Sequence, residues 1–194
     1  MPSAPPENFH SLLATMKLAA ACLRESGVEF MLGGGLSIWA RGGPPTDHDV
    51  DFFLREGDAD RALDALADIG LRTEKPPEHW LYKAWDGDNL VDLIFSPAGG
   101  AIGDEHFARA TELEVSAQRL LVASIDDVLT TKLLAITEQE PDFRPVLEIA
   151  RAVREQVDWG DVAARTSASP FARGFFAMAE GLGIVHPEAL SLSS

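Results

Sequence analysis

The chain of 194 residues carries 16 Lys and Arg against 31 Asp and Glu, which gives a formal net charge of -15. A hydrophobic content of 46% and a charged content of 24% are ordinary globular values and exclude wholesale disorder. A single cysteine, Cys22, excludes a disulfide scaffold and a cysteine-rich zinc module. The acidic excess also speaks against non-specific nucleic-acid binding, which requires Lys and Arg to neutralise phosphates.

No run reaches the about 18 consecutive apolar residues of a membrane span. The N-terminal residues lack the basic and apolar regions of a signal peptide. We therefore expect a cytoplasmic protein with no membrane partner.

The first half of the chain alternates short apolar runs with glycine-containing turns. Apolar residues at helical spacing between Phe9 and Leu23, stopped by Gly27, predict an amphipathic helix. Asp58 is a candidate N-cap for a second helix, which Gly70 closes. Strands are expected at 28–32, 50–54, 80–85 and 90–95, with one or two more in 114–123 and short helical segments at 36–40 and near 106.

The second half reads as helical. Ser124 and Asp127 resemble a capping box with Asp in the Glu position, and a helix should follow to about Glu138. Further helices are expected from 141–145 to about 156 and within 158–181, with an irregular end. The pattern predicts an α+β core over 1–123 followed by a C-terminal helical region over 124–194.

Three consecutive glycines, at 33–35, stand between an expected strand and an expected helix. Glycine lets a backbone approach a phosphate closely, and a helix N-terminus offers N–H donors. A tight structural turn explains the same residues equally well. Neither the Rossmann nor the P-loop spacing is present.

Asp49 and Asp51 open an expected strand, where alternate residues share a face and lie roughly 7 Å apart along the chain. Neighbouring carboxylates repel one another unless a cation lies between them. Oxygen ligands of this kind suit Mg²⁺ or Mn²⁺. The alternative is a solvated acidic loop, which the apolar residues that follow Asp51 disfavour.

Asp92 interrupts another apolar strand and needs a partner if it is buried. The Asp86-Gly87 signal predicts a hairpin that places Lys83 on the same sheet face as Asp92. Two interpretations stay open: a Lys83–Asp92 cross-strand pair, or a third metal ligand with Lys83 near a nucleotide phosphate.

Lys132 interrupts an apolar helix face and either extends to solvent or meets a polyphosphate. Asp142 either caps the next helix or acts at the site. The five histidines share no metal-ligand spacing, and Ser37 has no neighbouring His and acid of a hydrolytic triad.

In this order, Gly34-Gly35, then Asp49-Val50-Asp51, then Val91-Asp92-Leu93, the motifs resemble the nucleotidyltransferase fold of the polymerase-beta superfamily. Over about residues 28–95 the resemblance implies a mixed sheet with flanking helices. His48 stands where that family has an apolar residue.

The region around Lys132 and Asp142 resembles the AbiEii/MenT nucleotidyltransferase toxins. This implies transfer to the 3′ end of tRNA and a small antitoxin as partner. The Gly-Gly and His48-Asp49 motifs are also similar to antibiotic nucleotidyltransferases of the lincosamide and aminoglycoside type. A catalytically silent nucleotide-binding or interaction protein is the third alternative.

The family also implies roles for individual residues. Asp49, Asp51 and Asp92 would hold two Mg²⁺ ions roughly 3.5–4 Å apart. Gly34, Gly35 and Ser37 would contact the β- and γ-phosphates of an NTP. Lys132, with Lys83 or Arg41, would neutralise the departing pyrophosphate, and Asp142 would be the acid of the fourth motif. For tRNA, the helical region offers Arg144, Arg151 and Arg154 at helical spacing.

Overall fold

The computed structural model describes residues 6–46 and 48–190. Asp47 and the first residues of the chain, which the signal-peptide argument concerned, lie outside this range, as do the last four residues of the expected irregular end. A mixed seven-stranded sheet runs in the order β3-β4-β5-β2-β1-β7-β6. Its strands are β1 (Phe30–Leu32), β2 (Asp49–Leu54), β3 (Arg72–Glu74), β4 (Leu81–Asp86), β5 (Asn89–Ile94), β6 (Thr111–Val115) and β7 (Gln118–Val122).

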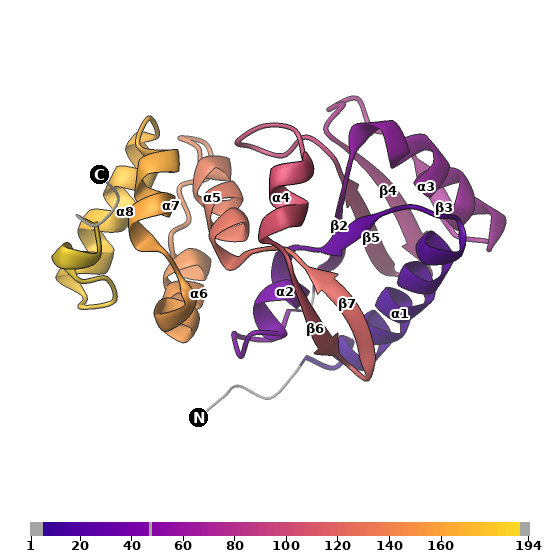
Figure 1. Ribbon diagram of the computed structural model, residues 1–194, viewed down its shortest axis with the longest axis horizontal. Helices are drawn as coiled ribbons and strands as arrows, with labels where there is room; N and C mark the ends of the chain where they lie inside the picture. Colours follow the sequence, from indigo (N-terminus) through magenta and orange to yellow (C-terminus); the bar gives the residue numbers. More distant parts are fainter. Residues whose placement is uncertain (1–5, 47, 191–194) are drawn as a thin grey trace.

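Helices α1 and α3 lie beside one face of the sheet, and the helices that follow the last strand extend away from it (Figure 1). The helices are α1 (Phe9–Glu25), α2 (Gly34–Trp39), α3 (Glu56–Asp68), α4 (Asp104–Arg109), α5 (Ile125–Ala135), α6 (Arg144–Val153), α7 (Trp159–Thr166) and α8 (Pro170–Gly181), with short 3₁₀ segments at Arg154–Gln156 and Pro187–Leu190. The α+β class and the helical C-terminal region are as the sequence predicts.

Strand β2 divides its side chains between two apolar cores. Val50, Phe52 and Leu54 are buried in the core beneath α1 and α3. Phe53 points the other way, into a second core shared with α5 to α8. Because alternate residues of a strand face opposite sides, Asp49 and Asp51 lie on the Phe53 side. The helical region therefore packs on the sheet face that carries the acidic residues.

A buried carboxylate in α5 links that helix to α4 and α7. Asp127 in α5 is 3% exposed and accepts hydrogen bonds from Arg109 at the end of α4 and from Arg165 in α7. This corrects the predicted capping box, because Asp127 turns away from the helix start. Ser124 caps α5 alone, accepting from the Asp126 backbone N–H at 3.2 Å.

Two other expectations were wrong in detail, and one strand was missed. Helix α3 begins at Glu56 with Arg55 at its N-cap, so Asp58 lies in the first turn. Helix α5 ends at Ala135 instead of Glu138. Strand β3 was not predicted, because its three residues are polar, half-buried or exposed, and lie at the sheet edge. Within the described residues, no helix has both the length and the apolar character needed to cross a membrane.

Candidate metal and nucleotide site

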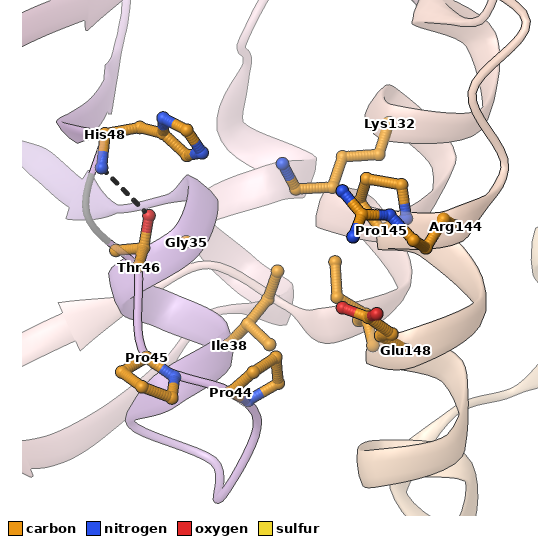
Figure 2. A pocket seen from close by; sticks show the side chains of 11 residues that line it. Gly35, Ile38, Pro44, Pro45, Thr46, His48, Lys132, Arg144, Pro145 and Glu148 are labelled. Carbon is orange, nitrogen blue, oxygen red and sulfur yellow. Dashed lines mark hydrogen bonds between the residues drawn. The ribbon is translucent and has the colours of Figure 1, made fainter. Parts of the chain in front are cut away.

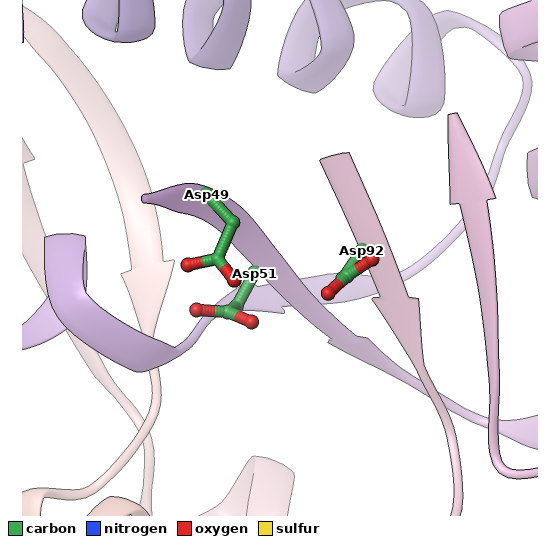
Figure 3. Close-up of side chains that lie close together, drawn as sticks. All are labelled: Asp49, Asp51 and Asp92. Carbon is green, nitrogen blue, oxygen red and sulfur yellow. The ribbon is translucent and has the colours of Figure 1, made fainter. Parts of the chain in front are cut away.

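Three carboxylates converge on one face of the sheet. Strands β2 and β5 are parallel with Asp51 directly opposite Asp92, and Asp49 lies one alternation earlier on β2. One oxygen from each carboxylate lies within 4.8 Å of the others (Figure 3). The sequence prediction that Asp49 and Asp51 share a face is confirmed, and the strand pairing brings Asp92 to them.

The glycine turn encloses Asp51. The Gly33 N–H donates to the Asp51 carbonyl at 2.8 Å, and the Gly35 backbone hydrogen-bonds the Asp51 side chain. Gly34 adopts a φ of +49°, which favours glycine, and a β-carbon there would overlap the Asp51 carboxylate. The turn therefore sets the position of the central carboxylate.

Crowding changes the protonation of the cluster. Removal from water and the nearby Asp49 carboxylate raise the pKa of Asp51 to about 7, although Lys132 acts in the opposite direction. Burial also raises the pKa of Asp92, whereas the Lys83 ammonium opposes that shift. Without a cation, these carboxylates therefore cannot all ionise easily at neutral pH.

Lys83 and Asp92 form the cross-strand pair that the hairpin predicts. The two residues are register partners, and Lys83 Nζ lies 3.1 Å from Asp92 Oδ1. Asp92 is at the same time a member of the acidic cluster. The two interpretations of Asp92 that the sequence left open are thus compatible.

A cleft of about 240 Å³ opens between α2 and the helical region. Figure 2 shows the Lys132 ammonium directed across this cleft, with Arg144 beside it. Its electrostatic effect on Asp51 connects Lys132 to the acidic cluster. The cleft is lined by Gly35, Ile38, Pro44, Pro45, Thr46, His48, Lys132, Arg144, Pro145, Glu148 and Ile149.

No protein-family model matches the chain, and no curated protein matches it. Solved structures do. The solution structure of the antibiotic-resistance factor ANT(2″)-Ia is 16% identical with a TM-score of 0.60, covering 89% of this chain and 98% of that one. The same protein has been solved in complex with adenylyl-2″-tobramycin, with a TM-score of 0.59, 16% identity and coverage of 85% and 98%.

Two further structures match over nearly the full length of both chains. JHP933 from Helicobacter pylori is 14% identical, with a TM-score of 0.57 and coverage of 98% and 97%. A nucleotidyltransferase-like protein from Paracoccidioides brasiliensis is 16% identical, with a TM-score of 0.53 and coverage of 98% and 95%. The chain has the nucleotidyltransferase fold. These matches do not show the specific resemblance to the AbiEii/MenT toxins.

Within this nucleotidyltransferase fold, three of the predicted site residues make their hydrogen bonds to groups outside the acidic cluster. Ser37 is fully buried and donates to the Gly34 carbonyl at 2.7 Å. Arg41 donates to the carbonyls of Ser37 and Val122. Asp142 accepts from the Arg144 N–H just before α6, in a second depression that Lys132 also lines. None of these three side chains is directed at the carboxylates by the contacts it makes.

The sequence predicted Arg144 on an RNA-binding face and gave neither Thr46 nor Glu148 as a site residue. The structure places all three in the cleft. Thr46 fits tightly against Gly35, where a β-carbon would lie 2.7 Å from the Thr46 hydroxyl. The sequence signal for Arg144 was its helical spacing with Arg151 and Arg154, which does not show the direction in which that helix runs.

Proposed function

We propose that the protein is a metal-dependent nucleotidyltransferase, which transfers a nucleoside monophosphate from an NTP to an acceptor hydroxyl. The observation that carries this proposal is the convergence of three carboxylates beside a cleft lined by two positively charged side chains, Lys132 and Arg144. Carboxylates bind divalent metal ions, and positively charged side chains in the cleft suit the negative charge of a triphosphate.

The donor set fits a hard divalent cation. Asp49, Asp51 and Asp92 offer only oxygen ligands, close enough together to share one ion. The raised pKa values of Asp51 and Asp92 reflect a site in which charged carboxylates are unfavourable without a cation. When bound, Mg²⁺ or Mn²⁺ would neutralise phosphate charge and acidify the attacking hydroxyl.

The remaining steps belong to the chain's own residues. Lys132 and Arg144 would hold the β- and γ-phosphates in the cleft, which Gly35 of the glycine turn also lines. The acceptor oxygen forms a bond to the α-phosphorus while the bond to the β-phosphate oxygen breaks, and pyrophosphate leaves. A carboxylate of the cluster takes up the hydroxyl proton.

For the acceptor, we propose a small hydroxylated molecule instead of the tRNA 3′ end. Along the exposed side of α6 and its 3₁₀ extension, Glu148 lies between Arg144 and Arg151, and Glu155 pairs with Arg154. An RNA-binding face needs several unopposed cations. ANT(2″)-Ia, whose full length shares this fold, has been solved with an adenylylated antibiotic. A tRNA acceptor with an antitoxin partner is the competing candidate, supported by the sequence resemblance alone.

The test begins with binding. Mg²⁺ with an NTP analogue bridged by methylene between the α- and β-phosphorus should raise the melting temperature more than either component alone. A hundredfold excess over Kd stabilises by about 2.7 kcal/mol. Labelled NTPs are then incubated with total RNA and, separately, with hydroxylated small molecules that include tobramycin. Asp49→Ala supplies the inactive control. No shift with any of the four nucleotides would support a silent protein and reject the proposal.

A further inference from the structure

The sheet sets the site residues out in a line. Across the strand order, the glycine turn follows β1, Asp51 lies on β2, Asp92 on β5, Lys83 on β4 and Glu74 on β3. Register partners share one face of a sheet, so these side chains lie on the face opposite α1 and α3. The acidic cluster thus has two sides, one at the glycine turn and one at β4 and β3.

A neighbouring row on this face continues away from Asp49. Its register partners are Leu90 on β5, Trp85 on β4 and Arg72 on β3. Leu90 and Trp85 are half-buried, and the Arg72 guanidinium carbon lies 3.7 Å from the centre of the Trp85 ring. We call Leu90, Trp85, Lys83 and Arg72 the acceptor shelf.

The in-line geometry of phosphoryl transfer gives different roles to the two sides of the acidic cluster. The attacking and leaving oxygens lie on opposite sides of the phosphorus that is transferred. In the proposed function the leaving pyrophosphate lies toward the glycine turn and Lys132. The acceptor hydroxyl must then approach from the Asp92 side, where the sheet continues into the acceptor shelf.

Resting on the proposed function, we propose that the acceptor is a hydroxylated ring compound with an acidic group, bound on the acceptor shelf. Leu90 and the part of the Trp85 ring that Arg72 leaves uncovered provide the apolar surface against which a ring packs. Arg72 forms no hydrogen bond or ion pair with any described residue, Glu74 included, so its donors are open to a carboxylate or phosphate.

The position and the charge of Arg72 set the length and the chemical class of the acceptor. Strand β3 lies two strand spacings, roughly 10 Å, from β5, which separates the acidic group from the reacting hydroxyl by about one ring and its substituents. The Lys83 charge is already opposed by Asp92. A polyamine such as tobramycin would meet a like charge at Arg72, although Glu74 on the same face of β3 would attract it.

Two matched probes isolate the acidic group. Phenyl β-D-glucuronide and phenyl β-D-glucoside differ only by a carboxylate in place of a hydroxymethyl group. Both are titrated by NMR into protein loaded with Mg²⁺ and the methylene-bridged NTP analogue. We expect the glucuronide to bind at least fivefold more tightly, and Arg72→Gln to abolish that preference. Arg61→Gln is the matched control, because Arg61 is an exposed arginine of α3, beside the opposite sheet face.

Trp85→Leu should weaken both sugars about tenfold and leave analogue binding unchanged, with the fold checked by circular dichroism. Equal affinities for the two sugars, a preference that survives Arg72→Gln, or no sugar binding to analogue-loaded protein would each overturn the acceptor shelf while the proposed function stands. Tighter binding of tobramycin, or of an RNA hairpin ending in CCA, would overturn the acidic small-molecule class. Failure of the analogue itself to bind would reject the proposed function, and the shelf with it.

Discussion

Gly34 and Asp51 fit together only because residue 34 has no side chain, since a β-carbon there would overlap Oδ2 of Asp51. Gly34→Ala should therefore displace the central carboxylate and strain a backbone held at a φ of +49°. We expect it to abolish Mn²⁺ binding and to destabilise the fold by about 1–3 kcal/mol. Calorimetric titration with Mn²⁺ and urea unfolding measure the two effects.

Gly57→Ala is the control for this substitution. Gly57 lies in α3, and a β-carbon there meets nothing within 4 Å. Alanine also has the higher helix propensity, so this variant should be as stable as the natural protein or more so. Normal Mn²⁺ binding by Gly34→Ala would contradict the role of the turn.

Asp51 should make the metal-free protein less stable as the pH rises. Its folded pKa is about 7, whereas a carboxyl in an unfolded chain titrates near about 4. The folded state therefore binds the Asp51 proton more tightly than the unfolded chain does. The contribution of this proton to the free energy of unfolding is complete below about pH 4 and is lost by about pH 7. The slope is at most about 1.4 kcal/mol per pH unit. Urea unfolding in EDTA from pH 4.5 to 8 measures it.

Asp51→Asn should flatten that profile, and Asp88→Asn, at an exposed hairpin turn, should not. An unchanged slope in Asp51→Asn would assign the pH dependence to other groups.

Metal affinity should increase with pH over the same range. The proton on Asp51 must leave before the carboxylate can bind a cation, so protons and metal compete. Below about pH 7 the Mn²⁺ affinity should fall up to about tenfold per pH unit for one displaced proton. Electron paramagnetic resonance of free Mn²⁺ measures this affinity. A Mn²⁺ affinity that is constant between pH 5.5 and 7.5 would be incompatible with a protonated Asp51.

Asp127 should be the most sensitive polar residue of the helical region. It is 3% exposed and binds both Arg109 and Arg165, so Asp127→Ala leaves two guanidinium groups without their shared partner. Because both arginines retain contact with water, we expect a loss of about 1–3 kcal/mol in unfolding free energy. Asp161→Asn, which breaks only a partly exposed pair with Arg165, should cost less than about 1 kcal/mol. Equal costs in thermal unfolding would argue against this network.

The charges of α6 and its 3₁₀ extension separate the two acceptor classes. Arg151→Glu combined with Arg154→Glu should leave transfer to a small molecule unchanged, because Arg151 is exposed and Arg154 pairs with Glu155. Activity should also change little between 50 and 200 mM salt. A tRNA acceptor would instead lose transfer in this variant, with a steep decrease over that salt range. Radiolabel transfer at several salt concentrations distinguishes these outcomes.

Local pattern predicted which side chains of the acidic cluster share a sheet face. The two-residue period of a strand places Asp49 and Asp51 on one face, and the hairpin register pairs Lys83 with Asp92. Helix ends were less accurate: Asp58, expected as an N-cap, lies in the first turn of α3. Asp127, expected in the capping box of α5, binds the distant Arg109 and Arg165 instead.

The sequence by itself determined which residues alternate, where the chain turns, and that three aspartates stand on apolar strands. Those properties depend on neighbours a few positions apart. Only the tertiary structure decided that Asp92 lies opposite Asp51 and that the Asp51 carboxylate occupies the space beside Gly34. It also decided that Ser37 is buried and that Arg144 lies with Lys132 in the cleft. Each of these depends on how strands order themselves and how helices pack on the sheet. Such contacts join residues far apart in the chain, and no local period encodes them.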